Sequence, residues 1–261
     1  VSLEVKLGAA PALRTTYTHG LAGELLSVSR PGSLVTTYAH NAAGDVTRIT
    51  HRSGSQVLSF FEYAYDAGGL RVGRVSPAGA ESYFYDAANR LVMSQGASEV
   101  ETFVYDSVGN ILEISNANGT RTFEHDAANR LVSEAGATPV TYAHDANGNL
   151  IRRTAGGEVR EYVWDSRDKL RAVAVGGTTV STFAYHPMTD LMSSKRQSQG
   201  VERSTIWLDQ NPLADVEAGH TVVDYARLDG YDRIESIHAT AASTAHYPLR
   251  DALLSVYQLA T

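Results

Sequence analysis

Aromatic, polar and apolar residues follow one short phrase that recurs along most of the chain. In the stretch 103–112, FVYDSVGNIL, two rings stand two positions apart, an aspartate follows, and an apolar run comes after a few small residues. A spacing of two puts both rings on the same face of a β-strand, whereas a helix would splay them apart. Tyr, Phe, Val and Thr dominate these stretches, and all four favour strands. The phrase therefore predicts a strand, a tight turn and the start of a return strand.

The phrase recurs nine times with a period of about 20 residues. Its second ring, or an imidazole in the same position, is found at His19, His40, Tyr65, Tyr85, Tyr105, His125, His144, Trp164 and Tyr185. A fixed period of this length is the signature of a repeat architecture, in which each unit packs on its neighbours. We therefore expect nine consecutive repeats over residues 15–195.

Another ring precedes each of these positions by two residues, so that the strands carry paired rings on one face. We expect the rings to pack on one another across neighbouring strands as a structural ladder. The predicted ladder residues are Tyr38, Tyr63, Tyr65, Tyr83, Tyr85, Phe103, Tyr105, Phe123, Tyr142, Tyr162, Trp164, Phe183 and Tyr185. Exposed rows of Tyr and Trp can also stack on sugar rings, so carbohydrate binding stays open as an alternative.

Each strand is followed by a turn motif such as DAAN or DSVG. Asp or Asn at the first position accepts hydrogen bonds from backbone amides two residues later. Gly or Asn at the fourth position tolerates the positive φ of a type I turn that closes into a bulge. The predicted structural turn residues are Asn41, Gly44, Asp66, Gly69, Asp86, Asn89, Asp106, Gly109, Asp126, Asn129, Asp145, Gly148 and Asp165. Because Gly20 and His186 take the first position in the first and ninth repeats, we expect looser turns there.

Each repeat also needs a second turn to bring the chain back. Gly, Asn and Pro supply such turns at 116–120, 136–139, 155–158 and 175–178. No stretch combines a 3.6-residue apolar period with helix caps. The predicted fold class is therefore all-β, a long antiparallel meander of strand pairs.

The overall composition excludes several classes of protein. A hydrophobic content of 43% with 22 glycines fits an ordered, turn-rich protein, and the formal net charge of −7 offers no basic face for nucleic acid. No cysteine is present, so disulfides and thiolate chemistry are excluded, and no apolar run approaches the roughly 20 residues of a membrane span. Because the 261 residues begin without Met or a signal-peptide core, we expect them to be a piece of a longer polypeptide.

No residue pattern predicts a catalytic, cofactor-binding or metal-binding site. His19, His40, His125 and His144 occupy the strand position that Tyr fills elsewhere, so we interpret them as substitutes for a ladder ring. A His and the Asp after it point to opposite faces of a strand and cannot easily share a metal ion. The DANGN motif at 145–149 lacks the spacing of a calcium-binding EF-hand loop, and no G-x-S-x-G nucleophile motif occurs. The prediction is a protein that is not an enzyme.

The phrases YFYDAANRLV, FVYDSVGNIL and YAHDANGNLI resemble the tyrosine–aspartate (YD) repeats of the Rhs family. That family includes bacterial polymorphic toxins, shells of insecticidal toxin complexes and animal teneurins. Segments 204–216, 225–237 and 246–261 resemble the end of the conserved Rhs core. The resemblance implies three regions, namely 1–14 as an N-terminal continuation of the sheet, 15–195 as the repeats, and 196–261 as a core-like segment that stops before any plug, self-cleavage motif or toxin domain.

The resemblance also implies that the meander curls into part of a hollow β-spiral shell. Such a shell houses a C-terminal toxin or effector domain and helps deliver it, and its partners are the remainder of an Rhs polypeptide or a neighbouring shell sheet. The implied location is secreted, extracellular or on the cell surface, after delivery by a bacterial export system. The alternative is a secreted or surface adhesion module that binds carbohydrate or a receptor through the repeat aromatics and loops. Neither function calls for a cofactor, nucleic acid or a transmembrane segment.

Overall fold

The computed structural model describes the backbone of residues 2–5, 13–198, 200, 202–208, 211–217, 220–227, 234–239, 244–250 and 256–260. Side chains are described for residues 14–198, 200, 202–206 and 215–217. The chain divides into two compact units, with Val1–Glu99 and Tyr225–Thr261 in unit 1 and Val100–Asp224 in unit 2.

The described residues contain 25 β-strands. Those of unit 1 are β1 Ser2–Val5, β2 Leu13–His19, β3 Leu25–Arg30, β4 Leu34–His40, β5 Val46–Ser53, β6 Gln56–Tyr65, β7 Arg71–Ser76, β8 Gly79–Tyr85, β9 Leu91–Gln95, β23 Ile234–Ala239, β24 Thr244–Arg250 and β25 Val256–Ala260. Those of unit 2 are β10 Val100–Tyr105, β11 Ile111–Asn116, β12 Gly119–His125, β13 Leu131–Ala135, β14 Val140–His144, β15 Leu150–Ala155, β16 Glu158–Trp164, β17 Leu170–Val175, β18 Thr178–Tyr185, β19 Met192–Gln197, β20 Arg203–Leu208 and β21 Asn211–Glu217. Strand β22, His220–Arg227, contains the boundary between the two units.

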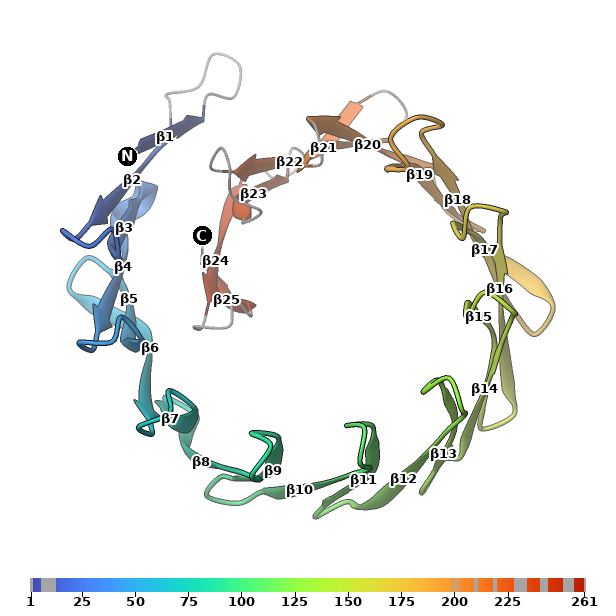
Figure 1. Cartoon of the computed structure of the whole chain (residues 1–261). Helices are drawn as coiled ribbons and strands as arrows, with labels where there is room; N and C mark the ends of the chain where they lie inside the picture. Colours follow the sequence, from blue (N-terminus) through green and yellow to red (C-terminus); the bar gives the residue numbers. More distant parts are fainter. Residues whose placement is uncertain are drawn as a thin grey trace. The chain divides into compact units, whose positions relative to one another are not determined.

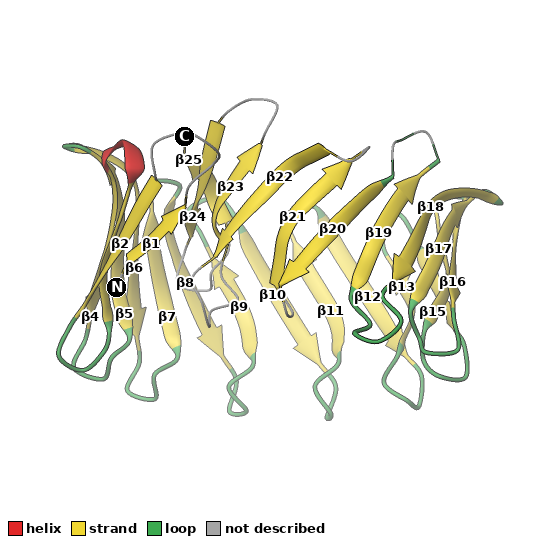
Figure 2. Cartoon of the chain, turned by 90° about the horizontal axis from the view of Figure 1, so that it is seen from above, coloured by secondary structure: helices red, strands yellow, loops and turns green. Residues whose placement is uncertain are grey.

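Within each unit, strands that follow one another in the sequence pair in antiparallel fashion. The run from β1 to β9 does so in unit 1, and the run from β10 to β22 does so in unit 2. Figure 1 and Figure 2 show this succession of hairpins. The predicted all-β antiparallel meander is therefore confirmed. One short 3-10 turn, η1 at Pro31–Ser33, joins β3 to β4 and was not predicted.

The returns between repeats are tight turns in which glycine has positive φ. Between β15 and β16, Gly156 and Gly157 have φ of 55° and 85°, and between β17 and β18, Gly176 and Gly177 have φ of 56° and 80°. Positive φ at both central residues is the requirement of a type I′ turn, whose twist matches that of the flanking strands. These glycines allow two-residue connections and keep the hairpins in register.

The repeat strands also share a bulge at their second ring. The pairing register shifts by one residue between Phe84 and Tyr85, between Ala143 and His144, and at the equivalent place in the other repeats. A bulge of this kind re-aims the side chain at that position and increases the local twist. The second ring is thereby turned toward the preceding repeat.

The alternation of side chains gives each unit two sheet faces. The face that carries the paired rings is called the ring face below. In unit 1 its buried centre is formed by Ile49, Phe61 and Tyr63, and the rings of Phe61 and Tyr63 lie nearly parallel with centroids 6.4 Å apart. On the opposite face, apolar side chains such as Val163 in unit 2 are 54% exposed. The apolar contacts are thus concentrated on the ring face.

Candidate functional site

The second ring of several repeats makes a hydrogen bond to the preceding repeat. In each case the polar tip of the ring donates to the backbone carbonyl of the residue that begins the preceding return strand. These bonds are Tyr65 Oη to Val46 O (2.8 Å), Tyr85 Oη to Arg71 O (2.7 Å) and Trp164 Nε1 to Leu150 O (2.8 Å). The ring therefore connects neighbouring repeats by packing and by a directed bond.

The exposure of the ladder rings distinguishes packing from an open platform. Tyr63 is 6% exposed and is buried in the unit 1 centre. The other predicted ladder residues are half-buried, namely Tyr38, Tyr65, Tyr83, Tyr85, Phe103, Tyr105, Phe123, Tyr142, Tyr162, Trp164, Phe183 and Tyr185. Half-buried rings with bonded tips suit cross-strand packing better than sugar stacking, which needs an exposed ring face.

The turn after each paired ring is held by its first residue. In the turn that follows β8, the Oδ1 atom of Asp86 accepts hydrogen bonds from the amides of Ala88 (2.8 Å) and Arg90 (2.9 Å). The amide of Asn89 donates to the Asp86 carbonyl at 3.0 Å, and Asn89 has φ of 61°. The aspartate thus satisfies the turn amides while the fourth residue adopts the left-handed region.

The same geometry recurs in both units. The first-position side chains that accept backbone amides are Asn41, Asp66, Asp106, Asp126, Asp145 and Asp165. The fourth-position residues with positive φ are Gly44, Gly69, Gly109, Asn129, Gly148 and Asp168. Asp168 stands where Gly or Asn is found in the other turns, and a short polar side chain can adopt this region at modest cost.

The first and ninth turns differ from the others in their first residue. At Gly20 the usual backbone bonds are kept, from Gly20 N to Glu24 O (2.8 Å) and from Gly23 N to Gly20 O (3.1 Å). The Glu24 carboxylate fills the space of the absent side chain and accepts the Ala22 amide at 3.1 Å. The expectation of a looser turn is therefore wrong at Gly20. The turn at His186 is one residue longer, because its amide donates to the carbonyl of Leu191.

Cations and amides next to the turn keep several of these carboxylates ionised. The Arg130 guanidinium donates to Asp126 (Nε to Oδ2, 2.7 Å), and together with the Arg130 backbone amide it lowers the pKa of Asp126 to about 2. The backbone amide and then the guanidinium of Arg90 lower the pKa of Asp86 in the same way. Carboxylates held in this state are hydrogen-bond acceptors at neutral pH and are poorly suited to donate a proton.

A further set of bonds links each turn of unit 2 to the next turn along the same edge of the sheet. The links are Asn110 Nδ2 to Asn129 Oδ1 (3.0 Å), Arg130 Nη1 to Asp145 O (3.1 Å), Asn149 Nδ2 to Asp168 Oδ1 (2.7 Å) and Arg167 Nη1 to Asp190 Oδ1 (2.9 Å). Sequence reasoning missed these links. The available signal was the polar donor that often follows the fourth turn position, as in Asn110 and Arg130.

The described residues show no cluster of side chains of the kind that holds a metal ion. Within this part of the chain, no group of three or more His, Asp or Glu residues is placed to hold a metal ion. The Nδ1 atoms of His40 and His125 are buried and have no hydrogen-bond partner, which fits imidazoles that stand in for ladder rings. Among the described helices, none has the length and apolar character needed to cross a membrane.

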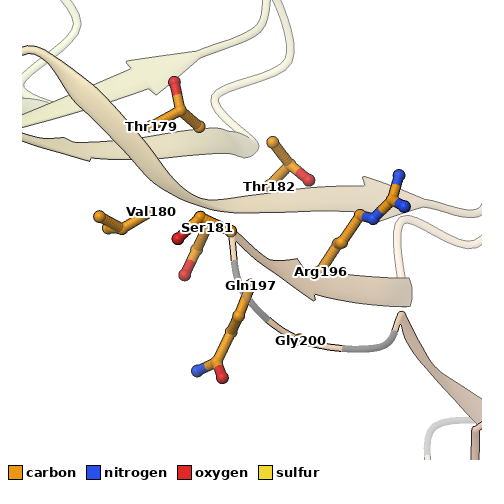
Figure 3. A pocket seen from close by; sticks show the side chains of 8 residues that line it. Thr179, Val180, Ser181, Thr182, Arg196, Gln197 and Gly200 are labelled. Atoms are coloured by element: carbon orange, nitrogen blue, oxygen red, sulfur yellow. The ribbon is translucent and has the colours of Figure 1, made fainter.

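A surface hollow of about 230 Å³ lies over β18 and β19 (Figure 3). It is lined by Thr179, Val180, Ser181, Thr182, Arg196, Gln197, Ser198 and Gly200. Figure 3 shows that Arg196 and Gln197, which are adjacent on β19, point to opposite sides of the strand. Their polar groups therefore do not converge on one ligand position.

Comparison with known families identifies the repeated strand–turn unit. The sequence model of the teneurin YD-shell family matches residues 75–214, which is more than half of the 261 residues. The chain belongs to the teneurin YD-shell family. The resemblance to YD repeats is thereby confirmed, and the bonded rings and turn carboxylates described above are features of its YD-shell repeats.

Solved structures with the same fold include toxin-complex proteins. A crystal structure of TcdB2–TccC3 without its hypervariable C-terminal region is 14% identical, with a TM-score of 0.51, and the match covers 96% of this chain and 17% of that one. A crystal structure of TcdB2–TccC3 is 15% identical, with a TM-score of 0.50, and the match covers 96% of this chain and 18% of that one. The YD-shell chain thus spans less than a fifth of these proteins, and the likeness shows the fold alone. A search of curated proteins found no match.

Proposed function

We propose that this chain is a structural segment of an Rhs-type encapsulating shell that houses a C-terminal toxin or effector domain and helps deliver it. The observation that carries the proposal is the match to the YD-shell family over residues 75–214. The partners are then the remainder of an Rhs polypeptide or a neighbouring shell sheet, together with the enclosed domain. The function places the chain outside the producing cell, after export.

The geometry of the paired strands suits the wall of an encapsulating shell, that is, the sheet that separates its contents from solvent. Antiparallel pairing satisfies the backbone groups between consecutive strands, and the rings and turns add bonds between neighbouring repeats. A wall must exclude solvent and proteases from its contents, and it needs no reacting groups of its own.

The test uses the polypeptide in which residues 1–261 occur, with its natural C-terminal region. We expect the C-terminal region to resist a protease that digests the same region when it is produced alone. Gly109→Val should open the wall and restore digestion, because φ at Gly109 is 101° and a β-branched residue is strained there. Ala87→Val, at a turn position without positive φ, is the matched control. Equal digestion of the enclosed and the free region would contradict the proposal.

Adhesion to carbohydrate or to a receptor is the alternative function, and the half-buried rings do not favour it. A glycan array with the 261-residue chain separates the two functions. Saturable glycan binding that is lost in Trp164→Ala, without a change in protease protection, would support adhesion. Protection without glycan binding would support the shell.

A further inference from the structure

Two turns of unit 2 contain the same Ala-Asn-Gly triplet in different surroundings. Asn118 lies between β11 and β12, and Asn147 lies in the turn between β14 and β15. These are the two Asn-Gly sequences of the chain. Asparagine is thermally labile, and a following glycine has no side chain to hinder attack of its nitrogen on the asparagine side chain. Because the triplets are identical, a difference in reactivity between them reports on the structure around them.

The reaction of an Asn-Gly sequence converts asparagine to aspartate or isoaspartate and releases ammonia. At Asn118, the backbone nitrogen of Gly119 bonds to the side-chain carbonyl carbon, and the bond from that carbon to the side-chain nitrogen breaks. The proton of the Gly119 amide leaves with the ammonia, and a succinimide ring remains. Water opens this ring at either carbonyl, so the net change is the addition of water and the loss of ammonia.

The side chain of Asn118 is free to approach the attacking nitrogen. Residues 117–120 are exposed to water, and a Cβ atom placed on Gly119 meets nothing within 4 Å. The backbone amide of Asn118 donates to Asn116 Oδ1 at 2.9 Å, but its side-chain amide makes no hydrogen bond to any described residue. Attack requires the reacting atoms to meet in a suitable orientation, and this side chain gives up no hydrogen bond to do so.

The side chain of Asn147 is held by the next turn along the edge of the sheet. Its Nδ2 atom donates to Asp168 Oδ1 at 3.0 Å, and Asn149 Nδ2 donates to the same oxygen at 2.7 Å. The bond from Asn147 must break before its side chain can turn toward the nitrogen of Gly148. A hydrogen bond to a carboxylate that has to break first should slow the reaction about tenfold.

We propose that Asn118 is a site of spontaneous deamidation and isoaspartate formation, and that Asp168 protects Asn147 from the same reaction. Aspartate at position 118 adds a negative charge to the turn. Isoaspartate also lengthens the main chain, because the backbone then passes through the side-chain carbon. Since this turn joins the paired residues Asn116 and Gly119, an added backbone atom disturbs the closure of one hairpin. The proposal does not depend on the proposed function.

The experiment incubates the folded 261-residue chain at mildly alkaline pH and follows both sites by mass spectrometry of tryptic peptides. Cleavage after arginine places Asn118 in peptide 91–121 and Asn147 in peptide 131–152. The same measurement in urea gives the ratio of the two rates that the flanking residues alone produce. We expect the ratio of the Asn118 rate to the Asn147 rate to be about tenfold larger in the folded chain than in urea. A folded ratio equal to or smaller than the ratio in urea would overturn the proposal.

Asp168→Gly is the decisive variant. It removes the acceptor of Asn147, and glycine tolerates the φ of 57° at this turn position, as Gly109 and Gly148 do in other turns. We expect Asn147 to deamidate about tenfold faster in this variant, while the rate at Asn118 stays unchanged. Asp168→Asn keeps an acceptor oxygen at the same position, so it is the matched control and should leave Asn147 protected. An unchanged rate at Asn147 in Asp168→Gly, or an equal acceleration at both sites, would overturn the proposal.

Discussion

At the scale of single residues, two side chains stabilise the repeats, namely the first residue of the turn and the second ring of the strand. The first-position carboxylate of a turn accepts amides inside its own turn, as Asp126 does from Ala128 and Arg130 at 2.8 Å and 3.0 Å. The second ring acts between repeats, as Trp164 does when it donates to the carbonyl of Leu150. The carboxylate therefore fixes local geometry, whereas the ring couples one repeat to the preceding one.

The ionisation of Asp126 should follow the contact with Arg130. The folded-state pKa of about 2 lies below the ordinary value of 3.8, so folding favours the carboxylate form. Its contribution to stability is complete above about pH 5 and is lost as the pH falls through about 4 toward 2. Carbon-13 NMR of the carboxyl group should report this pKa, and Arg130→Leu should raise it. An unchanged titration in Arg130→Leu would contradict this explanation.

The pKa of the Tyr83 hydroxyl should be unusually high. Burial and its hydrogen bond to Glu81 raise the pKa of Tyr83 to about 12. Because the folded state holds the phenolic proton more tightly than the unfolded state, this contribution is complete below about pH 10 and is lost as the pH rises toward 12. Absorbance titration and melts at alkaline pH check it. Tyr83→Phe should show a smaller loss of stability over that range, and an identical loss would refute the prediction.

At the scale of elements, the hairpin is the building block of the sheet. Each is closed by a turn whose fourth residue has positive φ and by a bulge that directs the second ring toward the preceding hairpin. Such a hairpin depends on one backbone conformation and, at Tyr65, Tyr85 and Trp164, also on one hydrogen bond to the preceding repeat, and each can be removed by a single substitution.

Substitutions at Gly109 should measure the free-energy cost of its backbone conformation without a contribution from side-chain clashes. A Cβ atom placed on Gly109 meets nothing within 4 Å, so only the φ of 101° opposes a side chain. We expect Gly109→Val to lower the free energy of unfolding by about 1–3 kcal/mol. Gly109→Asn should be tolerated, because Asn89 and Asn129 occupy the same turn position with positive φ. Denaturant midpoints measure the difference, with Ala87→Val as a second control, and equal midpoints for the valine variants would show that the turn strain is absent.

The bond from the ring tip should contribute separately from ring packing. Tyr65→Phe keeps the ring and removes the donor to the Val46 carbonyl, so we expect a loss of about 1 kcal/mol. Tyr142→Phe is the matched control, because the Tyr142 hydroxyl has no bonded partner among the described residues. Chemical denaturation of the two variants gives the comparison. A loss of equal size in both would assign the effect to something other than the bond.

At the scale of the molecule, each unit is a succession of nearest-neighbour contacts. Extensive contacts between the described strands join elements that follow one another in sequence. Stability in such proteins is approximately a sum of terms for single repeats and for neighbouring pairs. A destabilising substitution in one turn should therefore lower the stability of the neighbouring strands, and this effect should decrease with distance along the sheet.

Hydrogen exchange should show this decay. We expect Gly148→Val, at a φ of 94°, to speed amide exchange most in β14 and β15 and less in β12 and β17. Exchange in β3–β5 of unit 1 should stay unchanged. Gly148→Asn is the control for the loss of glycine itself. A uniform increase across both units would show that the chain unfolds as one cooperative body.

The period and the local chemistry of this sequence were sufficient to predict the strand–turn–strand unit, the all-β meander and the family. The alternation of rings depends on a two-residue spacing, and the turns depend on residues within five positions of one another, as from Asp86 to Arg90. Interactions of such short range can be recognised without knowing what lies on the next strand.

The tertiary structure alone decided which distant side chains meet. The links from Asn110 to Asn129, the buried contact between Thr36 Oγ1 and His51 Nδ1 at 2.9 Å, and the stacking of Arg71 on Tyr63 join different strands. Each depends on pairing register, and a shift of one residue would send every side chain of a strand to the other face. The physical reason is that register is set jointly by the bulges, the turns and the packing of the ring face, and no single segment contains all three.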